Sequence, residues 1–256
     1  MERKYLEYFE GAFDSTVADK RKPENKPYVA YSKTDGVVFT DIPEEPTSAY
    51  QMVDLGLSVK WADKNVGAEN PQDNGLYFSW GNVEGHAVDE SGNVTDGYSF
   101  DRDTYATTLG GQYKGSTLDV DHDAATVNMG KEWLMPTINE TRELVENTDH
   151  YYIDLNGNTV AESELYGYKL RSICFVKKGE VFNYNDRTNF IEFPYAGSCD
   201  GSLLGGDGLG GVVWSSSVYE SDVENAHCLG FNNYGGLDGG DYKRRYFGLS
   251  VRGVHA

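Results

Sequence analysis

The side chains suited to redox or metal chemistry are scattered in this sequence. Its three cysteines, Cys174, Cys199 and Cys228, form no Cys-x-x-Cys pair, and three thiols are too few for a disulfide framework. Cys199 and Cys228 could approach one another in space, but the default for isolated cysteines is a buried, inert thiol. No two of the five histidines have the spacing of metal ligands. We therefore predict no metal site and no disulfide.

Three further segments have the composition of a calcium-binding or phosphate-binding loop but lack the residue order of such a loop. The acidic clusters at 119–123 and 154–158 lack the glycine at the sixth position and the glutamate at the twelfth that a calcium loop requires. The glycine-rich run 205–211 lacks the lysine and the following helix of a phosphate-binding loop. We expect no catalytic residue and no cofactor.

The chemistry that the sequence favours is non-covalent recognition by residues 219–247. Tyr and Phe alternate there with Asn, Asp and Gly without a regular period. Aromatic rings bury a large area at low entropy cost, and small polar groups adapt their hydrogen bonds, as in antibody-type binding surfaces. We predict a ligand-binding set that lies in loops, is mainly solvent-facing and clusters on one face: Tyr219, Glu220, His227, Asn232, Asn233, Tyr234, Leu237, Asp238, Asp241, Tyr242, Tyr246 and Phe247.

Charge excludes two classes of partner. The 256 residues include 41 acidic and 22 basic ones, which gives a formal charge of −19 at pH 7. Such a field repels phosphate backbones and anionic lipid headgroups, so we predict that the chain binds no nucleic acid. No window approaches the length of a membrane span, so we also predict that the chain does not insert into a membrane. A basic region followed by an apolar run is missing after Met1, and we expect a soluble product without a signal peptide.

Residues 1–47 predict a small module of their own. Apolar side chains between residues 5 and 13 fall near one face of a helix, and the segments 28–31 and 37–40 flank a glycine turn, which predicts a hairpin. A module of this size cannot bury a large core alone. We expect it to serve attachment or oligomerisation, while residues 48–256 form the ligand-binding domain.

The pattern of residues 48–256 predicts an α+β domain with two helices and short strands. The helices are expected near 121–129 and 138–147, the second opened by a capping box of Thr137 and Glu140. The polar insertion 82–117 is expected to be surface loop, and the four tryptophans to be mostly buried. The expected strands lie at 53–61, 75–81, 151–155, 168–175, 181–184, 190–195, 214–217 and 248–254.

Several short motifs occur in a fixed order between about residues 50 and 254. They are Val53-Asp54-Leu55-Gly56-Leu57-Ser58-Val59-Lys60-Trp61, Asn65-Val66-Gly67-Ala68, Tyr77-Phe78-Ser79-Trp80-Gly81, Asp123-Ala124-Ala125, Trp133-Leu134-Met135-Pro136-Thr137, Trp214-Ser215-Ser216-Ser217 and Gly248-Leu249-Ser250-Val251-Arg252. Together they resemble the "major paralogous domain" family of Bacteroidetes and their phages. That family is related to the C-type-lectin-like fold of formylglycine-generating enzymes, so the resemblance implies a C-type-lectin-like domain.

Some proteins of this fold are the variable proteins of diversity-generating retroelements, whose adenine-containing codons are rewritten near the end of the gene. Residues 219–243 are similar, because they mix Asn with residues that a rewritten Asn codon encodes. Glu220 and Lys243 do not fit that scheme. A tolerant glycine-rich loop in an ordinary paralogue remains the alternative.

The resemblance implies a non-enzymatic protein that binds a cell-surface receptor, either protein or glycan. The first alternative is the tip adhesin of a phage tail fibre in the virion. Residues 1–47 would then join the domain to the fibre or assemble it as a homo-oligomer such as a trimer. The second alternative is a bacterial surface adhesin that binds glycans. An enzyme on the formylglycine-generating scaffold is the third alternative, but those relatives carry two reactive cysteines in the C-terminal part of the fold, where this chain has Cys228 alone among its last 50 residues.

Overall fold

The computed structural model describes residues 30–32, 36–38 and 50–255. The chain divides into two units, Met1–Ala49 and Tyr50–Ala256. In the first unit β1 (Ala30–Ser32) pairs antiparallel with β2 (Gly36–Val38), as the predicted hairpin requires. The helix predicted between residues 5 and 13 lies outside the described residues.

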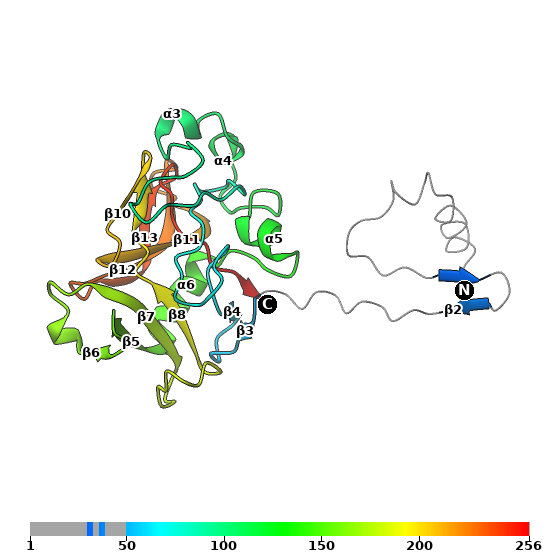
Figure 1. Ribbon diagram of the computed structural model, residues 1–256. Coiled ribbons are helices and arrows are strands. Elements are labelled where there is room, and N and C mark those ends of the chain that lie inside the picture. The colour runs from blue at the N-terminus through cyan, green and yellow to red at the C-terminus, as the bar shows by residue number, and fades with distance from the viewer. Residues whose placement is uncertain (1–29, 33–35, 39–49, 256) are drawn as a thin grey trace. The chain divides into compact units, whose positions relative to one another are not determined.

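The second unit is a mixed α+β fold with mostly antiparallel strands (Figure 1). Its sheets have the strand orders β6-β5-β7-β8, β11-β12-β13, β14-β4-β3 and β10-β9. The strands are β3 Met52–Val53, β4 Lys60–Ala62, β5 Thr148–Asp154, β6 Thr159–Val160, β7 Leu170–Lys177, β8 Phe190–Pro194, β9 Ser198–Asp200, β10 Leu203–Gly205, β11 Gly210–Val218, β12 Asn225–Asn232, β13 Leu237–Arg244 and β14 Val254–His255. A short 3-10 helix, η1 (Glu162–Glu164), follows β6.

Two of the helices confirm the prediction. These are α5 (Ala124–Met129) and α6 (Ile138–Asn147). Helix α6 begins with the expected capping box, in which the Thr137 hydroxyl accepts from the amide of Glu140 and the Glu140 carboxylate accepts from the amide of Thr137. These reciprocal bonds satisfy two amides that a helix start leaves unpaired.

Two more short helices lie in the insertion 82–117, where we had predicted only surface loop. Helix α3 (Arg102–Tyr105) is capped by Asp101, and α4 (Leu109–Gln112) is capped by Thr108. Each cap residue accepts a hydrogen bond from a backbone amide of the first turn, which stabilises even a single turn of helix. The loop prediction is therefore wrong for these eight residues.

Several predicted strands are interrupted. The prediction of one continuous strand over residues 53–61 is wrong, because the chain turns back at Gly56 (φ +74°) and β3 pairs with β4. Residues 75–81 and 248–253 contribute isolated bridges instead of strands, and 181–184 is irregular. By contrast, residues 219–243 were predicted to be loop and are largely the strands β12 and β13.

The four tryptophans are core residues, as predicted. Trp61, Trp80 and Trp214 are 0% exposed and Trp133 is 2% exposed. The indole of Trp214 donates to the carbonyl oxygen of Phe78 (2.7 Å), and the indole of Trp80 donates to that of Ser215 (2.9 Å). This reciprocal pair ties β11 to the segment around residue 79, so the strand that precedes the candidate site has a fixed position.

Candidate functional site

The frame of the site is the hairpin of β12 and β13, which is held from behind by α6. Gly239 allows this approach, since a Cβ there would meet the carbonyl oxygen of Thr141 at 2.6 Å. The Thr141 hydroxyl donates to the Gly239 carbonyl at 2.6 Å. The paired residues of β12 and β13 therefore keep defined positions, and His227 lies opposite Tyr242.

Three predicted residues form an aromatic cluster at the base of the hairpin: Tyr219, His227 and Tyr242. The rings of Tyr219 and Tyr242 stack with centroids 4.1 Å apart at 6°, and His227 meets Tyr219 edge-on at 5.2 Å. The Nδ1 of His227 lies 3.2 Å from the Gly240 carbonyl oxygen. Because a carbonyl only accepts, this contact favours a proton on Nδ1. Tyr242 is 46% exposed, so the cluster presents a fixed aromatic surface to solvent.

The tip of the hairpin holds Asn232, Asn233 and Tyr234, and here the prediction is partly wrong. Asn233 is 2% exposed, because its side chain donates to the carbonyl oxygen of Tyr168 at 2.9 Å. Asn232 is exposed, yet its side-chain oxygen accepts from the amides of Tyr234 and Gly236 and so shapes the turn. Tyr234 is 70% exposed and lies edge-on to Tyr166 at 5.2 Å.

Leu237, Asp238 and Asp241 also support the hairpin. Leu237 packs against the hydrophobic core. Asp238 accepts from the amide of Gly240 and Asp241 from that of Tyr242, both at 2.8 Å, beside the irregularity in strand register between Cys228 and Gly230. These carboxylates satisfy backbone donors where the regular ladder is interrupted.

The predicted residues thus do not form one compact cluster. A strand advances about 3.3 Å per residue, so the five steps from Leu237 to Tyr242 place the tip about 17 Å from the aromatic cluster. Glu220 is exposed in the turn that follows β11, near the base of the hairpin. The prediction of a single cluster is wrong, and the hairpin offers two separate surfaces.

A basic cleft of about 470 Å³ opens beside the base of the hairpin. It lies between the end of β13, the turn that joins β11 to β12, and the insertion that carries α3 and α4. Its charged lining residues are Arg102, Lys114, Glu224, Arg244 and Arg245, and its aromatic ones are Tyr105, Tyr113 and Tyr246. Of the predicted set, Tyr246 lines this cleft, and Phe247 stacks on Tyr246 at 5.0 Å while packing against the core.

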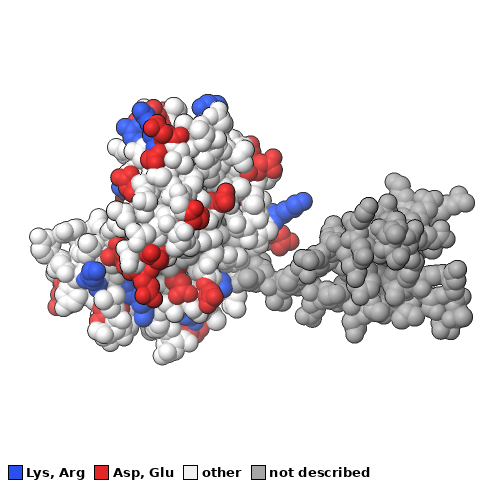
Figure 2. Space-filling model, turned by 45° about the horizontal axis from the view of Figure 1, so that its top comes forward, with Lys and Arg blue, Asp and Glu red and all other residues white. Residues whose placement is uncertain are grey.

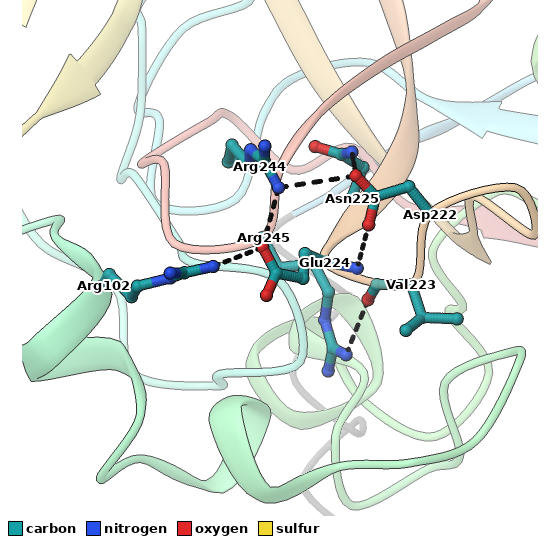
Figure 3. Close-up of polar contacts among 7 residues, drawn as sticks. All are labelled: Arg102, Asp222, Val223, Glu224, Asn225, Arg244 and Arg245. Atoms are coloured by element: carbon teal, nitrogen blue, oxygen red, sulfur yellow. Dashed lines mark hydrogen bonds and ion pairs between the residues drawn. The ribbon is translucent and has the colours of Figure 1, made fainter.

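Glu224 joins two arginines at the mouth of the cleft (Figure 3). Its Oε2 accepts from Arg102 and, at 2.8 Å, from Nη1 of Arg244. Asp222 lies 3.5 Å from the same Nη1 and also accepts from the side chain of Asn225 at 2.9 Å. The turn between β11 and β12 therefore holds its carboxylates against the end of β13.

Arg245 lies deeper and is held by neutral groups. It is 8% exposed and donates to the carbonyl oxygens of Gly110 (2.7 Å), Tyr113 (3.1 Å) and Val223 (3.3 Å). Its guanidinium carbon lies 4.3 Å from the ring centroid of Trp80. Burial raises the pKa of the neighbouring Tyr105 to about 12, although Arg245 opposes that shift. The Tyr105 hydroxyl thus stays protonated and donates to the Trp80 carbonyl at 2.8 Å.

Sequence reasoning missed the cleft, apart from Tyr246. Its other lining residues come from the insertion that was predicted to be plain loop and from the Arg244-Arg245 pair just after the hairpin. A usable signal was present, since two adjacent arginines stand out in a chain with 41 acidic and 22 basic residues. Their meeting with Arg102 and Lys114 follows from long-range packing, which no local pattern encodes.

The cysteines are buried free thiols in the structure. Burial raises the pKa of Cys199 to about 12 and that of Cys228 well above its ordinary value, which disfavours the reactive thiolate. Within the described ranges, no three His, Cys, Asp or Glu side chains are grouped as metal ligands, and no helix is long and apolar enough to span a membrane. In comparisons with known proteins, no family model, no curated protein and no solved structure matches this chain.

Proposed function

We propose that this chain is a non-enzymatic receptor-binding protein whose contact surface is the base of the C-terminal hairpin. The observation that carries the proposal is the stacked, partly exposed pair of Tyr219 and Tyr242 beside an open cleft. Tyr and Arg are enriched among residues that dominate binding energy, and both types are gathered here. Because the rings are already stacked, little side-chain entropy remains to be lost on binding.

The resemblance to C-type-lectin-like proteins also supports a buried framework that carries an exposed binding surface. Its motifs supply buried residues such as Trp80, Trp214 and Arg252. In the segment expected to bind ligand, β12 is largely buried and the exposed side chains come mainly from β13 and the turns. A framework that is buried and a contact surface that is exposed allow the surface to vary without loss of the fold. We propose a C-type-lectin-like domain displayed at the tip of a phage tail fibre, with a bacterial cell-surface receptor.

We expect Tyr242→Ala to weaken binding to cells at least fivefold, which corresponds to about 1 kcal/mol or more at a binding hot spot. Loss of the stack with Tyr219 should lower folding stability by no more than about 1.5 kcal/mol. The measurement is titration of labelled full-length chain on a panel of intact Bacteroidetes strains, with urea unfolding of each variant.

Tyr168→Ala is the matched control, because Tyr168 is 51% exposed and Tyr242 is 46% exposed. We expect the control to bind like the unmodified chain. Equal binding by both variants, or no binding of the unmodified chain to any strain, would contradict the proposed function.

A further inference from the structure

The basic cleft concentrates positive charge in a chain whose formal charge is −19. Its described lining contains four cations, Arg102, Lys114, Arg244 and Arg245, against the carboxylate of Glu224 in the lining and that of Asp222, which lies 3.5 Å from Arg244. Acidic side chains are spread over the visible face of the unit, while basic ones occur in a few small groups (Figure 2). An anion approaching this domain is therefore repelled by most of the surface and attracted to such a group.

Arg102 and Arg244 retain donors for a ligand carboxylate beyond those that Glu224 and Asp222 engage, although Asp222 also lies 3.5 Å from Nη1 of Arg244. A guanidinium carries five N–H donors, and Glu224 accepts one hydrogen bond from each of the two arginines at the same oxygen. Their side chains are 67% and 43% exposed, so both are accessible from solvent. Paired arginines favour carboxylates because the planar fork matches the two oxygens.

Arg245 adds a buried charge that no carboxylate neutralises within the described residues. Its hydrogen bonds go to the carbonyl oxygens of Gly110, Tyr113 and Val223, and its Nε lacks a hydrogen-bond partner there. Charges interact more strongly where water is excluded. A guanidinium fixed in place before binding therefore attracts an anion in the cleft more strongly than a mobile surface lysine would.

The aromatic walls favour a sugar as the carrier of the anion. The hydroxyls of Tyr105 and Tyr113 donate to the carbonyl oxygens of Trp80 and Thr117, so these side chains are fixed where they line the cleft. Tyr105 is 9% exposed, so Tyr113 and Tyr246 offer the larger part of the aromatic surface. The C–H face of a sugar ring packs on such a surface. A volume of about 470 Å³ lies within the range of small-molecule sites.

We infer that the basic cleft binds the carboxylate of an acidic sugar, such as a sialic or uronic acid, as part of the receptor. This inference rests on the proposed receptor-binding function and specifies its ligand class. The carboxylate pairs with the exposed cations of the cleft lining, Arg102, Lys114 and Arg244, while the sugar ring packs against the tyrosines.

The test is a glycan array of sialylated and uronate-containing glycans, each next to a parent whose carboxylate is reduced to an alcohol. We expect the full-length chain to bind acidic glycans at least tenfold more tightly than their reduced parents. Lys114→Gln and Arg244→Gln should each weaken that binding about tenfold, since each removes a charge-assisted hydrogen bond. Lys131→Gln, an exposed lysine that does not line the cleft, should leave it unchanged.

Equal binding of acidic and reduced glycans, or binding of no acidic glycan, would overturn the inference. Binding of a glutamate-rich peptide in place of every acidic glycan would overturn it in favour of an acidic protein ligand. The inference also fails separately from the proposed function. If cell binding still depends on Tyr242 but is unaffected by Lys114→Gln and Arg244→Gln, the receptor-binding function stands and the acidic sugar does not.

Discussion

Trp214→Ala is expected to lower the free energy of unfolding by about 3 to 5 kcal/mol, the usual cost of truncating a buried aromatic residue. Trp214 is 0% exposed and packs in the same core cluster as Trp80 and Trp133. The substitution leaves a cavity and removes the donor to the Phe78 carbonyl oxygen. Urea unfolding followed by the fluorescence of the remaining tryptophans measures the loss, because all four lie in Tyr50–Ala256.

Trp214→Phe is the graded control for this prediction. It keeps most of the apolar volume and loses the indole N–H, so we expect a smaller loss than for alanine. A change below about 1 kcal/mol for Trp214→Ala would mean that β11 is not anchored as described.

Arg252→Met is expected to cost about 3 to 5 kcal/mol, because it leaves three buried acceptors unsatisfied at about 1 to 3 kcal/mol each. Arg252 is 0% exposed and donates to the side chain of Asn65 (2.9 Å) and to the carbonyl oxygens of Ala62 (2.9 Å) and Glu192 (2.7 Å). Burial lowers its pKa to about 9, so it remains charged at pH 7. Methionine fills similar space but leaves three acceptors unsatisfied.

Arg252→Lys separates charge from geometry. An ammonium cannot reproduce the three fixed directions of the guanidinium, so we expect lysine to be nearly as destabilising as methionine. Arg142→Met, on the exposed surface of α6, should change stability by less than about 0.5 kcal/mol. Full stability of Arg252→Lys would show that charge alone is required.

Local signals predicted the parts of the fold that local chemistry determines. Helix α6 could be placed from the sequence because Thr137 and Glu140 are a reciprocal capping pair three residues apart. The burial of the tryptophans followed from their size and apolar character. The turn at Gly56 was missed because the alternation of residues 53–61 looks like one strand, whereas pairing between β3 and β4 decides the actual structure.

The site was predicted only in part, because strand pairing and long-range packing decide which of its residues come together. Tyr219, His227 and Tyr242 were identified by composition, and pairing of β12 with β13 brings them together. Asn233 was expected at the surface but is buried, because asparagine side chains also serve as partners for backbone groups in turns. The basic cleft requires the insertion around α3 to pack beside Arg244 and Arg245, a contact across more than a hundred residues.

Photo-crosslinking from the hairpin tests the central claim most directly. The full-length chain would carry p-benzoylphenylalanine in place of Tyr242 at the base or of Tyr166, which is 81% exposed beside the tip. After binding to intact cells and irradiation, we expect the receptor to be captured from position 242 and not from position 166. Capture from position 166 alone, or from neither position while cell binding is retained, would contradict a receptor site at the base of the hairpin.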